Sequence, residues 1–507
     1  MNSQLMNKEV LCIIDTRQIQ KYLFGSSVFV DTVGGSDIMD HILQDAINFA
    51  LHNIDTPLNE DEYDISMEFD VPIPYFENEK VKFQQIVCAA GNAMFIIRTG
   101  AFAQKIIRKI SRYYLDHTYA LNIAVAVVEK TDNFDTDKFY LYQKLNAVKV
   151  SSSTQKTLGA LPVVMKDKNT GDPVTDFLDG EYLSKATFLK RQALKQVTMT
   201  ANPESINTTN NYWAVIHADG NDLGLGISRV LKKVTTDYQK SILIRRKLNF
   251  NIKQNYDEIV SNTVRDLKNF YINTGNDEKN FINEFQPLHI GGDDINIICN
   301  AKFAFPFLHY FYKNLKGRYL WNSEELKVPL YACAGVAIVT RDFNFHEAYE
   351  LAEHCCKNAK TLAKKSYNLR DGFAGNWIDF QISDNLQAQN FDILREKIYT
   401  TQDGINLFLR PYCLDEAAKD EIFSYRKFIE KVKLIKNLPL NQSQKLILRE
   451  SYSVGKGEFN HWLNSCGIDL ENILDAPLYR DAEKNLHATW FDATEIANFI
   501  PAELEAI

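Results

Sequence analysis

Four consecutive residues, Gly291-Gly292-Asp293-Asp294, could bind a divalent cation. They stand between two apolar runs and are expected to form the tight turn of a β-hairpin, where glycine allows a positive φ. Two short carboxylates at the tip of such a turn repel each other unless a cation lies between them. Mg²⁺ and Mn²⁺ prefer hard oxygen ligands of this kind. The four residues alone are equally compatible with a metal site and with an ordinary solvated turn.

A further carboxylate favours metal binding. Asp219 ends an apolar run that is expected to be a strand, and Gly220 has no side chain to block a phosphate or a metal ion. In a ferredoxin-like sheet the first strand lies beside the central hairpin, so Asp219 is expected to meet Asp293 and Asp294. Three carboxylates there could hold two metal ions, which would orient a ribose hydroxyl and polarise an α-phosphate. A calcium-binding EF-hand starting at Asp219 is excluded, because two of its ligand positions would be apolar.

A basic helix face is expected beside these carboxylates. The range Phe345–Lys365 has an amphipathic helical pattern, and Lys360 and Lys364 share one face of it. Either lysine could reach a triphosphate, and a solvated lysine face is the alternative, more so for Lys364. His217 and His289 stand on the strands that lead to the site. They could tune a carboxylate or contact a base, although a histidine at such a position is more often a satisfied core residue.

The elements that would position these residues occur twice. From about residue 8 to 130 the sequence predicts a strand, a helix, a hairpin, a helix and a strand, and the same order recurs from about 210 to 382. This order is typical of a ferredoxin-like α+β fold. Beyond about residue 390 the patterns are helical. Arg426–Arg449 carries seven Lys or Arg against one Glu, which indicates either a solvated helix face or contact with RNA or an acidic partner.

Composition limits the class of protein. A chain of 507 residues is expected to form about three domains. Its net charge of −8 argues against a surface coated in nucleic acid but suits a small anionic substrate held through metal ions. None of the eight cysteines forms a Cys-x-x-Cys pair, so reduced cysteines in a cytoplasmic protein are expected. No signal peptide is visible, and no apolar run approaches the roughly 20 residues of a membrane helix.

Four motifs between residues 218 and 360 give the chain a resemblance to a known family. They are Ala218–Gly224, Gly291–Asp294, Cys333–Ile338 and Ala352–Lys360. Together they resemble the second palm domain of the large polymerase-like subunit of type III CRISPR complexes, which is similar to the GGDEF cyclases. The likeness extends over nearly the whole chain. Gly34-Gly35-Ser36 is similar to the family's first palm, and Arg410-Pro411-Tyr412 is similar to part of its C-terminal helical domain.

The resemblance implies an α+β fold of two ferredoxin-like palm domains packed face to face, with two ATP molecules between them. The expected limits are 1–135 for the first palm, 136–208 for a helical linker, 209–385 for the second palm and 386–507 for a C-terminal helical domain. The implied enzyme is a metal-dependent nucleotidyltransferase in antiviral defence. It would convert ATP into a cyclic oligoadenylate and release pyrophosphate.

The resemblance also implies a set of site residues. Asp219, Asp293 and Asp294 would be catalytic and, with Gly220, would hold two Mg²⁺ or Mn²⁺ ions. The nucleotide-binding residues would be Gly291, Gly292, Lys360, Lys364, Gly34, Gly35 and Ser36. His217, His289 and Asp222 are uncertain members of the site.

Departures from the family pattern modify these expectations. No histidine is followed by aspartate, so the HD nuclease that often accompanies the family is not expected, nor any DNA nuclease activity. Residues 162–174, where the family often has paired cysteines, contain none, so no zinc is expected. The family order Asp-Gly-Asp-Asn is here Asp219-Gly220-Asn221-Asp222, which makes Asp222 an uncertain ligand. The first-palm hairpin at residues 90–93 has no carboxylate, so it is interpreted as an acceptor or structural site.

Three functions remain open on this evidence. The first is the cyclase. The second is an architectural, nucleotide-binding subunit of an RNA-guided complex, with other subunits bound through the C-terminal helical domain. The third is a stand-alone relative that makes a signal without a guide complex. A template-dependent polymerase is less favoured, because no basic fingers or thumb of the needed size is visible.

Overall fold

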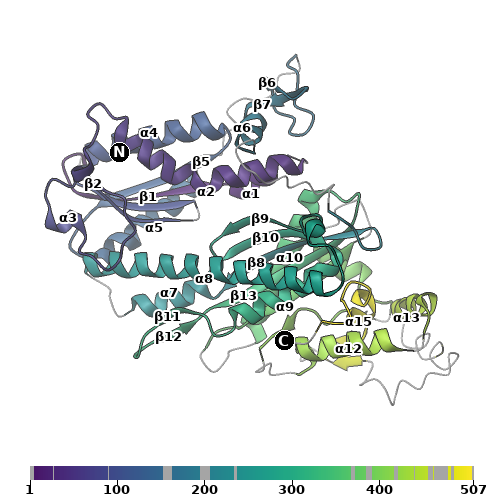
Figure 1. Ribbon diagram of the computed structural model, residues 1–507. Helices are drawn as coiled ribbons and strands as arrows, with labels where there is room; N and C mark the ends of the chain where they lie inside the picture. Colours follow the sequence, from purple (N-terminus) through teal and green to yellow (C-terminus); the bar gives the residue numbers. More distant parts are fainter. Residues whose placement is uncertain are drawn as a thin grey trace. The chain divides into compact units, whose positions relative to one another are not determined.

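The computed structural model describes residues 5–26, 28–89, 91–151, 163–194, 206–232, 237–366, 372–383, 391–402, 404–415, 421–438, 440–454, 461, 478–480 and 485–504. The chain forms two compact units, each assembled from separate segments. The first unit comprises 1–202, 224–256 and 319–329, and the second comprises 203–223, 257–318 and 330–507. Helices and sheets occur in both units, so the predicted α+β class is confirmed (Figure 1).

The first unit is built on a five-stranded sheet in the order β2-β3-β4-β1-β5. Its strands are β1 (Val10–Arg17), β2 (Tyr63–Asp64), β3 (Phe83–Ala89), β4 (Asn92–Ile97) and β5 (Asn122–Glu129). Without the short β2, four antiparallel neighbours remain in the ferredoxin-like order. The helices are α1 (Ile19–Phe24), α2 (Phe29–His52), α3 (Pro74–Glu77), α4 (Gly100–Thr118), α5 (Phe134–Ser151) and α6 (Lys185–Leu194).

One face of this sheet is covered by helices that are distant in sequence. Leu11 and Ile13 of β1 pack in one buried cluster with Phe134 of α5. Tyr238 and Ile242, at the start of α8 (Tyr238–Asn273), join the same cluster. The first half of α8 therefore belongs to the first unit, although its sequence lies within the second of the two repeats.

Helix α2 starts earlier than the sequence predicts. The residue types of Gly34-Gly35-Ser36 predict a turn before a helix that starts at about residue 37. All three residues instead lie buried inside this helix, so that prediction is wrong. A Cβ on Gly34 would lie 1.9 Å from the carbonyl oxygen of Lys190 in α6. The glycines thus allow α6 to cross α2 at close range, and this contact outweighs the low helix propensity of glycine.

The second unit is built on a six-stranded sheet in the order β16-β14-β13-β8-β10-β9. Its strands are β8 (Tyr212–Asn221), β9 (Phe285–Gly291), β10 (Asp294–Asn300), β13 (Tyr331–Thr340), β14 (Trp377–Ser383) and β16 (Tyr412–Cys413). Four adjacent strands, β13-β8-β10-β9, repeat the ferredoxin-like order of the first unit. The helices α9 (Ala304–Leu315) and α10 (Phe345–Ser366) belong to this unit.

Helix α10 crosses β13 at a glycine. A Cβ on Gly335 would lie 2.0 Å from the carbonyl oxygen of Ala352 and 2.3 Å from the backbone nitrogen of Cys356. Only a residue without a side chain permits this approach. Because α10 lies so close to the sheet, Lys360 on its later turns reaches Asp219 near the end of β8.

The remaining elements are short. They are α7 (Leu223–Leu231), β6 (Val174–Leu178), β7 (Glu181–Ser184), β11 (Tyr319–Asn322), β12 (Lys327–Pro329), α11 (Phe391–Ile393), β15 (Ile405–Asn406), α12 (Tyr425–Asn437), α13 (Gln442–Val454), β17 (Leu478–Arg480), β18 (Leu486–Ala488) and α15 (Phe491–Ile496). Strands β15, β18 and β17 form a small sheet, so the C-terminal part contains strands as well as helices. Within the described residues, no helix has the length and apolar character needed to span a membrane.

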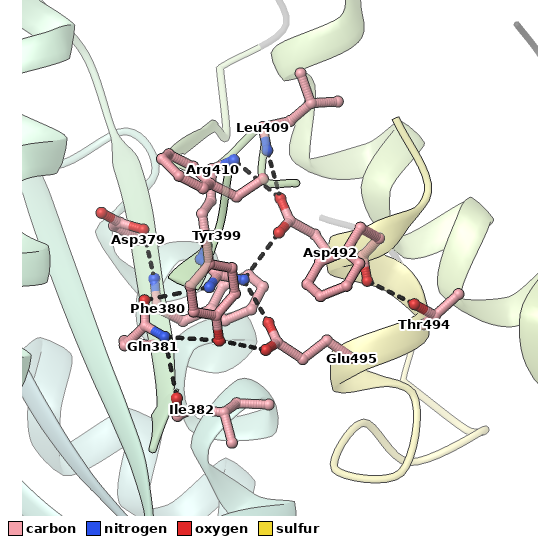
Figure 2. Close-up of polar contacts among 12 residues, drawn as sticks. Asp379, Phe380, Gln381, Ile382, Tyr399, Leu409, Arg410, Asp492, Thr494 and Glu495 are labelled. Atoms are coloured by element: carbon pink, nitrogen blue, oxygen red, sulfur yellow. Dashed lines mark hydrogen bonds and ion pairs between the residues drawn. The ribbon is translucent and has the colours of Figure 1, made fainter. Parts of the chain in front are cut away.

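A buried ionic network joins this C-terminal part to the second sheet (Figure 2). Arg410 is buried and its Nη1 donates to Asp492 at 2.8 Å and to Glu495 at 2.6 Å, both on α15. Its Nη2 donates to Gln381 of β14 at 3.2 Å. Tyr412 donates to the second carboxylate oxygen of Asp492 at 2.7 Å. The hydrogen bonds within this network replace the hydrogen bonds to water that the charged groups lose when they are buried.

Candidate active site

The hairpin between β9 and β10 has the two-residue turn that the sequence predicts. Gly291 pairs with Asp294, which leaves Gly292 and Asp293 at the tip. Gly292 has a φ of 71°, in the left-handed region where glycine is favoured. Gly291 has a different role, because a Cβ there would lie 2.4 Å from Nε2 of His289. The first glycine makes room for a histidine ring and the second makes the turn.

Asp219 lies on β8 next to this hairpin. The residue types of 219–222, Asp-Gly-Asn-Asp, predict a turn. The strand instead continues through Gly220 to Asn221, which pairs with Tyr331 of β13, so this prediction is wrong. Pairing with β13 keeps the backbone extended past Asp219. A Cβ on Gly220 would lie 2.7 Å from Oδ2 of Asp293 and 3.0 Å from its Cβ. The absence of a side chain at Gly220 therefore leaves a space, a cradle that the Asp293 carboxylate occupies.

Burial and nearby negative charge alter the pKa of one carboxylate of the site, Asp293. Burial and the neighbouring charges of Asp219 and Asp294 raise the pKa of Asp293 from 3.8 to about 6. The ammonium of Lys360 opposes this increase but does not cancel it. Negative charge is thus concentrated at the turn, and a cation would relieve the repulsion.

Replacing Asp293 by Asn should stabilise the protein, and the gain should depend on pH. The raised pKa means that ionised Asp293 is less favourable in the folded than in the unfolded chain. Stability is therefore lost as pH rises from 3.8 through about 6. We expect Asp293→Asn to raise the free energy of unfolding on the order of 1–3 kcal/mol at pH 8, with no gain below about pH 4.

Urea unfolding across this pH range measures the effect, in the absence of metal. Asp219→Asn is the matched control, because it removes the partner of Lys360 and should lower stability at pH 8. A destabilised Asp293→Asn protein at pH 8 would contradict the prediction.

Lys360 supplies the positive charge at this site. Its ammonium contacts Oδ2 of Asp219, with the lysine side chain 22% exposed and the aspartate side chain 35% exposed. Burial opposes the charged form, but the Asp219 carboxylate raises the pKa of Lys360 above its ordinary value. Lys360 is therefore a charged group held against a candidate metal ligand. Lys364 lies one turn further along α10 and is exposed.

Asp294 is held by a residue that the sequence did not single out. Nδ2 of Asn296, two residues further along β10, donates to Oδ1 of Asp294 at 2.8 Å. Oδ1 of Asn296 lies 2.7 Å from Nδ1 of His217 on β8. Alternation along a strand places residues 294 and 296 on one face of the sheet. The residue of β8 that lies opposite Asn296, however, depends on the register between the two strands.

Asp222 has a different partner from the other carboxylates. Its φ is 56°, and its Oδ2 accepts a hydrogen bond from the backbone N–H of Ala374 at 2.7 Å. Nδ2 of the neighbouring Asn221 donates to the carbonyl of Gly375 at 2.7 Å. Both side chains fasten the segment before β14 to the end of β8. This gives Asp222 a structural role and explains an aspartate at this position without metal binding.

The first unit carries a related but smaller arrangement. Asp15 pairs with Asn92, so by register Asp15 stands where Asp219 stands and Asn92 where Asp294 stands. Nζ of Lys149, on the helix after the last strand of the motif, lies 2.6 Å from Oδ2 of Asp15. An Asp–Lys pair therefore occurs in both units, which the sequence analysis missed. Residue 90 of the corresponding hairpin lies outside the described residues.

The predicted nucleotide-binding residues of the first unit lie elsewhere in it. Gly34, Gly35 and Ser36 are buried in α2 where α6 crosses. Helix packing accounts for the two glycines.

The donor set at the β9–β10 turn fits a divalent cation. Asp219, Asp293 and Asp294 offer carboxylate oxygens, and the Gly220 cradle keeps Asp293 close to the strand. As the side chains stand, no group of three or more His, Cys, Asp or Glu in the described part of the chain is arranged to hold a metal ion. Asp219 instead contacts Lys360, a positive group in the place where a cation would be favoured.

A family model matches the part of the chain that contains this site. Residues 212–369 match the family model described as Cas10/Cmr2, second palm domain. This range includes Asp219, the hairpin turn and Lys360. No curated protein matches the chain.

Solved structures share the fold of nearly the whole chain. A Csm1-Csm4 cassette in complex with pppApA matches with a TM-score of 0.54 and 12% identity, over 98% of this chain and 70% of that one. The same cassette with one ATP matches with a TM-score of 0.52 and 13% identity, over 98% and 70%. The complex with cA3 matches with a TM-score of 0.51 and 12% identity, over 98% and 70%. Identities this low show similarity of fold alone.

Proposed function

We propose that this chain, whose residues 212–369 form a second palm domain of the Cas10/Cmr2 type, joins nucleoside triphosphates at the β9–β10 turn. One observation carries the proposal. Asp219, Asp293 and Asp294 converge beside a charged lysine, where burial and the neighbouring carboxylates together raise the pKa of Asp293 to about 6. Strong perturbation of a carboxylate by its neighbours is typical of functional sites.

The carboxylates would hold Mg²⁺ or Mn²⁺, and two ions are expected. Such ions would polarise an α-phosphate and orient the attacking ribose hydroxyl. Gly220 leaves the strand open where Asp293 lies, and the Asn296 amide holds Asp294. Lys360 places a positive charge beside the carboxylates, where triphosphate oxygens would be attracted. Lys364 is exposed on the same helix and could bind the outer phosphates.

The substrate we propose is ATP, and the product a cyclic oligoadenylate made with release of pyrophosphate. The cassettes that share this fold were solved with pppApA, with one ATP and with cA3, which supports adenine nucleotides as the substrate class. Face-to-face packing of two palms, two ATP molecules between them and a cytoplasmic role in antiviral defence stay predictions from the resemblance.

Incubation with labelled ATP and Mn²⁺ tests the proposal. The wild type should release pyrophosphate, and the Asp293→Ala/Asp294→Ala variant should lose at least about 100-fold of this activity, because the charges that stabilise the reacting phosphate are gone. Asp116→Ala, which removes an exposed carboxylate of α4, should match the wild type. Mass spectra of the products with each of the four nucleoside triphosphates would identify base and ring size. The proposal fails if wild type and double variant are equally inactive under every activating condition.

An architectural role in an RNA-guided complex is the second candidate. It is favoured by the cassettes, in which the similar protein is solved together with Csm4. The basic range Arg426–Arg449 supports it less than the sequence suggested. Lys431 donates to the carbonyl of Thr489 at 3.2 Å, and Lys445 donates to the carbonyl of Lys436 at 2.8 Å. Part of the positive charge thus serves internal contacts. Co-purification with short RNA and small subunits would favour this role, and a pure, active, RNA-free protein would favour a stand-alone enzyme.

A further inference from the structure

A buried polar chain stands behind one carboxylate of the turn. It runs from His217 on β8 through Asn296 on β10 to Asp294. His217 is 6% exposed and Asn296 is 4% exposed, whereas the Asp294 side chain is 46% exposed. We propose that Asn296 and His217 are positioning residues, which hold the Asp294 carboxylate in the orientation that binds a divalent cation. This inference rests on the metal site of the proposed function.

The hydrogen bonds from His217 through Asn296 to Asp294 can run in only one direction. An ionised carboxylate accepts and cannot donate, so the NH₂ group of Asn296 must face Asp294. The amide oxygen of Asn296 then faces His217, and Nδ1 of the imidazole must carry the hydrogen that it donates. The ring of Tyr349 on α10 meets the His217 ring edge-on, at 5.7 Å between centroids. His217 is thus restrained by α10 on one side and by Asn296 on the other.

The first unit shows that the fold does not require this polar chain. By register, the pair His217 and Asn296 corresponds to Ile13 and Met94 of the first unit. Both residues are buried in the apolar cluster of that sheet. The same two positions of the same strand arrangement therefore accept an apolar pair.

The polar pair occurs where the turn carries an aspartate. In the first unit Asn92 stands in place of Asp294, and the residues behind it are apolar. Burying a histidine and an amide costs free energy that an apolar pair does not, even when both are hydrogen-bonded. The second unit accepts that cost beside its carboxylate, which indicates a role for the pair in holding Asp294.

The expected role is the one that partners of metal ligands usually have. A carboxylate that is already oriented loses little side-chain freedom when it binds a cation. Such partners typically change metal affinity by about 10–100-fold. Asp293 lies on the other side of the turn and contacts Gly220 instead. The two carboxylates of the turn are therefore held by different means.

The first unit supplies the variant that tests the inference. In His217→Ile/Asn296→Met the second unit receives the pair that the first unit carries at these positions. Mn²⁺ binding to the full chain, followed by electron paramagnetic resonance without nucleotide, should weaken about 10–100-fold. Thermal unfolding in the absence of metal should be unchanged or raised, because both polar partners are replaced together.

Asn300→Ala is the matched control. Asn300 is buried near the other end of β10 and donates to Glu284 at 2.8 Å, so it too is an amide that holds a carboxylate. Its loss should lower stability and leave Mn²⁺ affinity within about 2-fold of the wild type. The single variants test the order of the contacts. Nδ1 of His217 also lies 3.6 Å from Oδ1 of Asp294, which is longer than a hydrogen bond, so its main contact with the carboxylate runs through Asn296. Once Asn296→Met is present, His217→Ile should therefore cause little further loss.

The outcomes separate the inference from the proposed function. If the wild type binds Mn²⁺ and Asp293→Ala/Asp294→Ala does not, the metal site stands. Wild-type affinity in His217→Ile/Asn296→Met would then overturn only the positioning role. Equal losses in that variant and in Asn300→Ala would also overturn it, because the effect would be general. A wild type without Mn²⁺ binding would contradict both. Should the double variant fail to fold, Asn296→Met alone carries the test.

Discussion

Gly220→Ala should lower nucleotide turnover about 100-fold and leave the free energy of unfolding almost unchanged, because a small displacement of a reacting group is enough to cause such a loss. The added methyl would lie 2.7 Å from Oδ2 of Asp293 and 3.0 Å from its Cβ. Real side chains do not approach so closely, so Asp293 must move away from residue 220 and change its position relative to the other two carboxylates. The change affects the tip of a hairpin and no buried core contact. Pyrophosphate release and thermal unfolding, measured on the same preparation, check the two halves of the prediction.

Gly224→Ala is the control for this variant. It adds the same methyl four residues further along, at the start of α7, where no other part of the described chain comes within 4 Å of it beyond its neighbours in the helix. Alanine also favours the helix more than glycine does. Gly224→Ala should therefore be as active as the wild type and at least as stable. Equal turnover in the two variants would show that turnover does not depend on the space that Gly220 leaves for Asp293.

Arg410→Met should lower the free energy of unfolding of the second unit by about 3–5 kcal/mol, the usual effect of removing one partner of a buried ion pair. The guanidinium is buried with Asp492 and Glu495, whose side chains are 1% and 6% exposed. Methionine would leave both carboxylates charged, buried and without their cation. It would also remove the guanidinium bridge between α15 and Gln381 of β14 and leave the bridge through Tyr399 (Figure 2). A loss of this size is a large part of the stability of a typical domain.

Chemical unfolding near pH 7 measures this loss. Arg112→Met is the matched control, because Arg112 also pairs with a carboxylate, Asp116, at 2.7 Å, but on an exposed helix surface. Exposed pairs contribute little, so this variant should unfold almost as the wild type does. If Arg410→Met were no less stable than Arg112→Met, the network would not be what joins the C-terminal part to the sheet.

Several elements could be predicted from the sequence because local patterns specify them. The amphipathic range Phe345–Lys365 is α10, found at Phe345–Ser366. The helical pattern of residues 238–271 predicts a long helix, and this helix is α8, found at Tyr238–Asn273. The glycine-rich turn between two apolar runs is the β9–β10 hairpin. In each case the signal is a short-range periodicity or a backbone preference, which does not depend on distant residues.

Other features escaped prediction because a distant segment decides them. Glycines 34 and 35 are poor helix formers, yet α2 runs through them because α6 packs there. Asp219 stays in a strand because β13 pairs with β8 beyond it. Asn296 belongs to no sequence motif. Its role can be inferred only from the strand register, which places it opposite His217. The Asp15–Lys149 pair was missed for the same reason.

The Gly291–Asp294 turn combines features that the local sequence determines with features that only the tertiary structure determines. Its residue types already specified a tight hairpin with two carboxylates, because backbone preference and donor chemistry belong to the residues themselves. The partner of each carboxylate was decided by the tertiary structure: Asp293 fills the space at Gly220, and Asp294 is held by Asn296. The raised pKa of Asp293 also required the folded chain, since burial and repulsion exist only once β8 lies beside the hairpin.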